Sequence, residues 1–122
     1  MSHSNIKKVQ AILAYVAAAF SGALGQFCFK IFSSKLGEAP GLELILSPWL
    51  WVAMLSYFSV MILFIIGLRL WGEMSTLYPV YGTTFVWAAL MAVLWLGESI
   101  SPTGIAGISL VVVGIGLLNA GK

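Results

Sequence analysis

The sequence predicts an all-α integral membrane protein with four transmembrane helices, and three observations support this fold class. Hydrophobic residues make up 61% of the 122 residues and charged residues 8%, whereas soluble domains carry about 25% charged residues. Each apolar stretch approaches the ~20 residues that a helix needs to cross a hydrocarbon core of ~30 Å. Lipid offers no partner to a bare backbone amide, so such segments must be helical. Helices are expected at about residues 9–32, 48–70, 75–97 and 102–119.

The first expected helix follows a polar tail, residues 1–8, and opens a single membrane domain, residues 9–122. Lys7 and Lys8 ahead of an apolar run resemble the start of a signal peptide. The run is longer than the ~7–15 residues of a signal-peptide core, however, which predicts a retained helix. This helix is rich in alanine, serine and glycine. Small residues let helices approach closely in lipid, so we expect the first helix at the centre of a four-helix bundle.

The other three helices carry local start and stop signals. The second and fourth begin at Ser-Pro pairs, in which serine suits the N-cap and proline the first helical position. Tryptophans near both ends of the second helix suit the aromatic belts of a bilayer, and Arg69 beside one of them can extend to the headgroups. Pro79 predicts a loose first turn or a bend in the third helix. Gly97 to Ser99 predict a tight turn before the fourth.

The distribution of basic residues predicts the orientation in the membrane. Four spans place both termini on one side, together with Lys7, Lys8, Arg69 and Lys122, whereas Lys30 and Lys35 fall on the other side. The positive-inside rule therefore favours cytoplasmic termini. The net charge of +2 is too small to suggest a nucleic-acid partner.

Polar residues within the spans are the first candidates for function, because they are costly in lipid. Gln26 and Lys30 are four residues apart and share one face of the first helix, which Gly22 continues. One interpretation is a headgroup site in which Lys30 pairs with a phosphate or carboxylate. The alternative is a lysine that extends to the headgroups from a helix end.

The third helix offers an aromatic face that includes Tyr78, Tyr81 and Phe85, with Trp87 on a neighbouring face. Such a stripe serves either for packing or as the lining of a substrate path, and the tyrosine hydroxyls need partners. Glu98 at the end of this helix is either an exposed loop carboxylate or part of the site. No pattern resembles a catalytic dyad, a metal cluster or a phosphate loop, so we expect no enzymatic activity, metal or other cofactor.

The segment from Leu77-Tyr78-Pro79 through Phe85-Val86-Trp87 to Leu96-Gly97-Glu98, followed by a glycine-rich helix, resembles the drug/metabolite transporter superfamily. Within it, the size matches the small multidrug resistance group. The resemblance covers nearly the whole chain and implies half of a transporter fold that is completed by dimerisation. The fourth helix is similar to the one through which such transporters dimerise, and it places these residues in the interface: Gly107, Leu110, Gly114 and Asn119.

One position departs from the drug/proton antiporters of that group, whose first helix carries a glutamate two turns before a lysine. If that lysine corresponds to Lys30, Gly22 stands where the glutamate is expected. Glycine cannot exchange a proton. The chain therefore should not use that mechanism unless another acid, such as Glu98 or Glu43, substitutes.

The string Gly25-Gln26-Phe27-Cys28-Phe29-Lys30 resembles more closely the subunits of the aminoarabinose-phosphoundecaprenol flippase. This resemblance implies transport of a polyprenyl-phosphate-linked sugar across the bacterial inner membrane, as a multi-pass homodimer or as a heterodimer with a related four-helix subunit. Lys30, with Arg69, would contact the phosphate, and Gln26, Tyr78 and Tyr81 would line the sugar path. Two alternatives stay open: a multidrug or metabolite exporter of the same fold, and an accessory membrane subunit that does not transport.

Overall fold

The computed structural model describes residues 3–35 and 41–121, and the regular structure in these ranges is entirely helical. The helices are α1 (His3–Ser34), α2 (Gly41–Ile45), α3 (Pro48–Leu70), α4 (Met74–Tyr81), α5 (Thr84–Trp95) and α6 (Pro102–Ala120). Four segments are long and apolar enough to cross a membrane, namely Asn5–Ser34, Gly41–Leu70, Met74–Trp95 and Pro102–Ala120. This agrees with the expected all-helical, multi-pass membrane protein. Met1, Ser2 and Lys122 of the expected termini lie outside the described residues.

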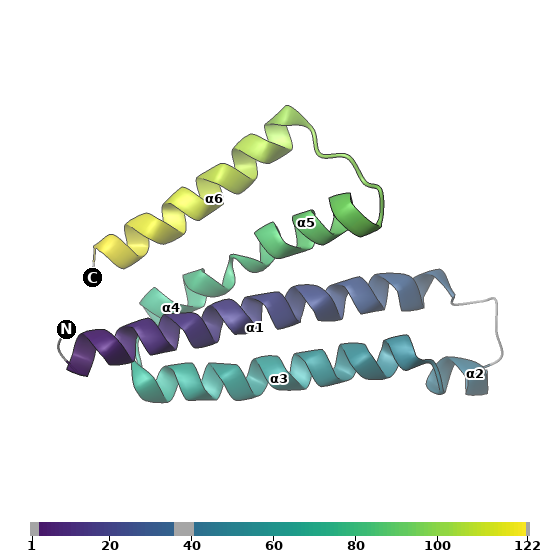
Figure 1. Ribbon diagram of the computed structural model, residues 1–122, viewed down its shortest axis with the longest axis horizontal. Helices are drawn as coiled ribbons and strands as arrows, with labels where there is room; N and C mark the ends of the chain where they lie inside the picture. Colours follow the sequence, from purple (N-terminus) through teal and green to yellow (C-terminus); the bar gives the residue numbers. More distant parts are fainter. Residues whose placement is uncertain (1–2, 36–40, 122) are drawn as a thin grey trace.

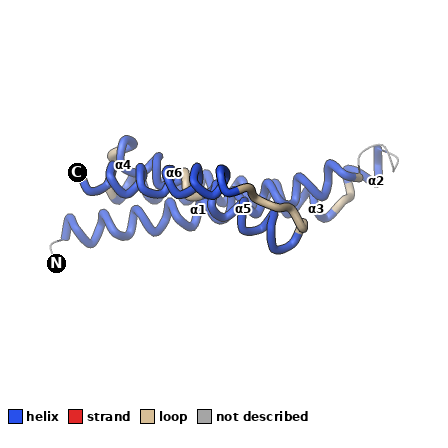
Figure 2. Tube along the Cα trace, turned by 90° about the horizontal axis from the view of Figure 1, so that it is seen from above, coloured by secondary structure: helices blue, strands red, loops and turns tan. Residues whose placement is uncertain are grey.

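The spans lie side by side in the order α3, α1, α4–α5 and α6 (Figure 1), and the view from above shows one thin layer (Figure 2). The four expected spans are therefore arranged as an open layer. The central place of α1 agrees with the expectation. In the most apolar 18-residue segment of α1, 39% is buried, whereas in the corresponding segment of α6 nothing is buried. The beginning of α1 and the end of α6 lie at the same end of the molecule (Figure 1).

Glycines let α1 and α3 pack closely. A Cβ built at Gly25 would lie 2.8 Å from the ring of Tyr57, and one built at Gly67 would lie 2.5 Å from the ring of Tyr15. Each glycine thus makes room for a tyrosine of the other helix. Tyr15 is 2% exposed and stacks on Phe64 with ring centroids 4.7 Å apart. This is the close backbone approach that small residues allow in lipid.

The first helix begins earlier than expected. Residues 3–8, which the sequence suggests as a polar tail, are the first turns of α1. The ammonium of Lys8 lies 5.4 Å from the ring centroid of Trp71, the residue that ends α3. A cation over the face of an indole ring is attracted to it, and this contact holds the start of α1 against the neighbouring span.

The third span is interrupted, three residues after Pro79. Gly82 and Thr83 separate α4 from α5, and their amides donate to the carbonyls three residues earlier, Pro79 and Val80. Their dihedrals, with φ near −60° and ψ of −17° and −12°, are those of a 3₁₀ turn. The proline removes one hydrogen-bond donor from the helix, and the bend expected from the sequence falls at this turn.

The serines that precede the first proline of α3 and of α6 differ in their hydrogen bonds. The Ser101 hydroxyl accepts a hydrogen bond from the Gly104 amide at 3.1 Å and caps α6 as expected. Ser47 takes the extended N-cap conformation at α3, but its buried hydroxyl makes no hydrogen bond.

The last span packs chiefly on α4, and none of its residues is buried. A Cβ built at Gly107 or Gly114 would meet no atom within 4 Å. Asn119 lies ~140° around the helix from Gly114, on the side of Ile115, and its amide oxygen is buried. Ile115 contacts the α4–α5 turn at Gly82. Asn119 therefore does not share the face of Gly107 and Gly114 to which the sequence assigns it.

Candidate functional site

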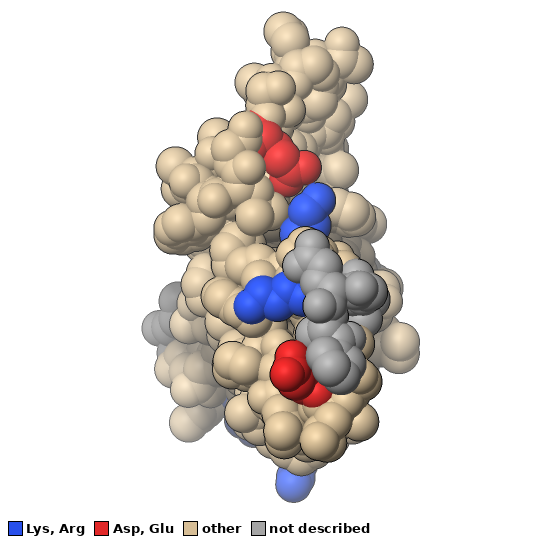
Figure 3. All heavy atoms as spheres, turned by 90° about the vertical axis from the view of Figure 1, so that its right-hand side faces the viewer, with Lys and Arg blue, Asp and Glu red and all other residues tan. Residues whose placement is uncertain are grey.

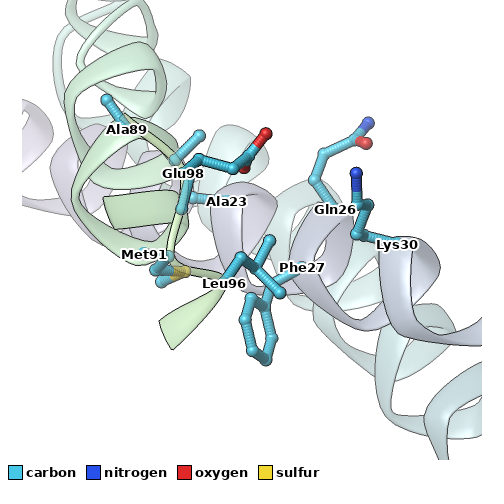
Figure 4. A pocket seen from close by; sticks show the side chains of 10 residues that line it. Ala23, Gln26, Phe27, Lys30, Ala89, Met91, Leu96 and Glu98 are labelled. Atoms are coloured by element: carbon cyan, nitrogen blue, oxygen red, sulfur yellow. The ribbon is translucent and has the colours of Figure 1, made fainter. Parts of the chain in front are cut away.

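A cavity of about 360 Å³ between α1 and α5 brings together three of the predicted site residues. Gln26 and Lys30 of α1 and Glu98, which follows α5, line this polar cavity. Figure 4 shows that the amide, the ammonium and the carboxylate are the polar groups around a wall that is otherwise apolar. All three residues are exposed to the cavity mouth or the surroundings. The polar cavity thus has the ammonium of Lys30 and the carboxylate of Glu98 on opposing elements.

The turn after α5 places Glu98 over this cavity. Gly97 has a φ of +71°, which is strained for other residues and ordinary for glycine. Through this turn the Glu98 amide donates to the Ala92 carbonyl at 3.0 Å. The wall of α5 consists of small side chains, Ala88, Ala89 and Ala92, which leave the space that the polar groups enclose.

A second cavity of about 470 Å³, here called the central cavity, continues from the first. Gln26 and Ala88 line both. Tyr57 of α3 and Tyr81 of α4 add two hydroxyls, and the side chain of Gln26 reaches that of Tyr57. The two cavities are neighbours along α1, with charged groups at Lys30 and Glu98 in the first and uncharged aromatic residues in the second.

Gly22 is the residue that opens the central cavity to Tyr81. A Cβ built at Gly22 would overlap the Tyr81 hydroxyl, whereas the ring carbon that bears this hydroxyl lies 3.2 Å away. The space beside Gly22 is therefore filled by a tyrosine from another helix. A carboxylate side chain fits there only if Tyr81 moves.

This contact gives a testable pair of substitutions. Gly22→Ala is expected to lower the free energy of unfolding by about 1–3 kcal/mol, because the new methyl overlaps the hydroxyl. Tyr81→Phe removes that oxygen, so the double variant is expected to recover at least about 0.5 kcal/mol of the loss. Unfolding in detergent micelles measures both values. Strictly additive losses would contradict the contact.

Three predicted site residues lie elsewhere. Arg69 lies in the last turn of α3, at the level of Tyr15, because Gly67 packs on that ring. The rise from Tyr15 to Lys30 along α1 is ~22 Å, so Arg69 and Lys30 cannot hold one phosphate together. This corrects the expectation that they do.

Tyr78 and Trp87 line neither the polar nor the central cavity. Tyr78 is 58% exposed, and its ring lies 6.3 Å from that of Tyr81. Trp87 packs edge-on against Phe20 with centroids 5.3 Å apart. Its buried indole N–H has no hydrogen-bond partner. Trp87 therefore serves packing, whereas Tyr78 lies largely exposed beside Tyr81.

Tyr57 and Phe85 line the central cavity, and of these two only Tyr57 was not singled out from the sequence. Tyr57 carries a hydroxyl within an otherwise apolar span, which is a signal that the sequence contains. Phe85 belongs to the aromatic face of the third expected helix, for which the sequence leaves open both packing and the lining of a substrate path.

Figure 3 looks onto the end of the molecule that carries the polar cavity and shows positive side chains in the middle with negative side chains above and below. Lys30 and Glu98 line the polar cavity, and Lys35 and Glu43 line another cavity at the α2–α3 junction. Within the part of the chain that the structure describes, no three His, Cys, Asp or Glu side chains lie close enough to hold a metal ion.

None of the protein-family models, curated proteins or solved structures compared with the chain matches it. The resemblance to the drug/metabolite transporters therefore stays a prediction. The case for a function depends on the geometry of the two cavities.

Proposed function

We propose that the protein is a membrane transporter that moves a polyprenyl-phosphate-linked sugar, or a similar amphipathic lipid, across a bacterial inner membrane. The observation that carries this proposal is the polar cavity. Its ammonium (Lys30), amide (Gln26) and carboxylate (Glu98) line one space at the end of an apolar layer. A lipid carries its charge in its headgroup alone, which suits charged groups gathered at one end of an apolar layer. A water-soluble substrate would need polar groups along its whole route through the protein.

Lys30 is the group for the phosphate. An ammonium pairs with a phosphate oxygen through a charge-assisted hydrogen bond, which is about twice as strong as a neutral one. Gln26 stands one turn deeper, where the polar and central cavities join. Its amide can both donate and accept, as can the hydroxyls of Tyr57 and Tyr81, and these are the partners that sugar hydroxyls need.

Glu98 favours a second candidate function, a small exporter of lipophilic cations. Its carboxylate lies in the polar cavity among walls that are otherwise apolar, and it attracts a positive charge. In this candidate function Glu98 takes the place of the glutamate that is absent at position 22. An exporter predicts that overexpression raises cell tolerance to lipophilic cations and that Glu98→Gln removes this tolerance. A flippase predicts no such protection.

Dimerisation is part of the proposal, because one open layer cannot enclose a substrate. Transport folds commonly pair two repeats around a site near the bilayer midplane. The outer face of α6, which carries Gly107, Leu110 and Gly114, is the surface for the partner, either a second copy or a related four-helix subunit. Leu110 is 72% exposed in the single chain, and the glycines allow close approach of another helix.

The Lys30 contact can be tested in proteoliposomes with a fluorescent polyprenyl-phosphate sugar and an impermeant quencher. Lys30→Ala is expected to slow transfer between leaflets at least about tenfold, because a hydrogen bond to a charged group contributes about 1.5–3 kcal/mol. Lys30→Arg is expected to retain part of the rate, since it keeps the charge.

Lys35→Ala is the matched control. Lys35 lies near the same end of the molecule but lines a different cavity, so its loss should leave the rate unchanged. A Lys30→Ala variant that transfers lipid at the unchanged rate would rule out the headgroup site. Co-purification with a larger enzyme, without transfer by the reconstituted protein, would favour the accessory subunit instead.

A further inference from the structure

An apolar groove of about 250 Å³ lies between α5 and α6, on the far side of α5 from the polar cavity. Val86, Leu90 and Val93 form one wall, and Ile105 and Ile108 form the other. Its one hydroxyl, that of Ser109, donates to the Ile105 carbonyl at 2.9 Å, so the groove offers no free hydrogen-bonding side chain. A dry apolar cavity of about 150 Å³ already admits benzene, and this groove therefore accommodates a hydrocarbon segment.

The groove and the polar cavity are separated by a single small residue. Ala89 lines both. Successive residues of a helix are ~100° apart, which places Ala89 on the ridge of α5 between Ala88 and Ala92 on one side and Leu90 and Val93 on the other. The surface of α5 between the charged site and the apolar groove is therefore lowest at Ala89, where only a methyl group projects.

We propose that the groove between α5 and α6 holds the hydrocarbon tail of the lipid whose phosphate occupies the polar cavity, with the lipid crossing α5 at Ala89. The proposal rests on the function proposed above. It assigns the two ends of one amphipathic molecule to two adjacent spaces of matching polarity. The tail then stays in contact with α5 and α6 while the headgroup lies against α1.

Another apolar space of about 190 Å³ also borders the polar cavity, but its access is poorer. Phe27 and Met91 line both spaces, so two bulky side chains stand where the first route has one methyl group. Phe27 also contacts Trp95 edge-on, with centroids 6.3 Å apart. A tail would have to displace these side chains, whereas Ala89 leaves the first route open.

A second copy of the chain is a poorer occupant than a lipid tail. The groove uses the side of α6 that carries Ile105 and Ile108, whereas Gly107 and Gly114 lie on the opposite side, ~100° or more around the helix. The two surfaces can be occupied at the same time. Because no residue of α6 is buried, α6 does not close the groove off from the surrounding lipid.

Two probes with one headgroup separate the tail site from the phosphate site: undecaprenyl phosphate, with a long tail, and isopentenyl phosphate, with a short one. Affinities are measured by native mass spectrometry of the full chain. Ser109→Phe fills the groove and is expected to weaken binding of the long probe on the order of tenfold, with the short probe unchanged. Ala106→Phe introduces the same side chain at an exposed position that lines none of these cavities, and both affinities should persist.

The outcomes distinguish this inference from the proposed function. Unchanged binding of the long probe to Ser109→Phe, or equal weakening of both probes, would overturn the tail site. Unchanged binding of both probes to Lys30→Ala would instead overturn the phosphate site and leave the groove result standing.

A crosslinking experiment on the unchanged chain removes any dependence on how the variant folds. Undecaprenyl phosphate with a photoreactive diazirine in its tail is expected to label residues 86–94 and 105–109. Labels confined to residues 20–27 would show that the tail takes the other route and would refute the proposal.

Discussion

Gly67→Ala is expected to lower the free energy of unfolding by about 1–3 kcal/mol, although alanine is the better helix former by about 1 kcal/mol. The added methyl would lie 2.5 Å and 2.6 Å from two ring carbons of Tyr15. That ring is fully enclosed and stacked on Phe64, so it has no free space to move into. Unfolding of the purified protein in mixed micelles, followed by circular dichroism, measures the change.

Gly116→Ala is the matched control, because it makes the same change in a helix where the new methyl meets no atom within 4 Å. It is expected to leave stability unchanged or to raise it slightly through helix propensity. If Gly67→Ala were as stable as this control, α1 and α3 would not approach as closely as the structure places them.

Gly114→Leu is expected to dissociate the proposed dimer while leaving the single chain folded. The added side chain meets open space within the monomer, but it would hold a partner helix away from a surface that needs small residues. We expect the dimer dissociation constant to rise at least about tenfold, equivalent to ~1.4 kcal/mol. Analytical ultracentrifugation in density-matched detergent gives this constant, and circular dichroism checks that the helices persist.

Gly116→Leu tests whether the effect belongs to one face. Gly116 lies two residues away and ~160° around the helix, and a Cβ there also meets open space. This variant should dimerise as the unchanged protein does. An intact dimer in Gly114→Leu, or equal loss in both variants, would remove Gly107, Leu110 and Gly114 from the interface.

Helix positions were largely predictable because their signals are local. The helix α3 begins at Pro48 and ends at Leu70, as expected, and α6 begins at Pro102 and ends one residue later than expected. Proline and serine act on their own backbone, so their effect needs no neighbour. The start of α1 was not predictable in this way, because Lys8 is held by Trp71 from another helix.

The candidate site was predictable only where it belongs to one helix. Gln26 and Lys30 share a face through their spacing alone, and both line the polar cavity. The approach of Glu98 to this cavity depends on the turn at Gly97, and that of Tyr57 depends on the packing of α3 on α1. The expectation that Arg69 and Lys30 bind one phosphate together is wrong. The four-span topology alone could have excluded it, because it places these two residues on opposite sides of the membrane.

Sequence alone was enough to predict the class of this protein: four apolar spans, the serine cap of α6 and the scarce polar residues within the spans. Hydrophobicity and backbone hydrogen bonding are properties of each segment, and a bilayer enforces both wherever the segment lies. Only the tertiary structure decided that the spans form an open layer and that α6 packs mainly at one end. It also decided that a methyl of Ala89 separates a charged cavity from an apolar groove. These features depend on which faces meet, and shape complementarity between distant residues sets that choice.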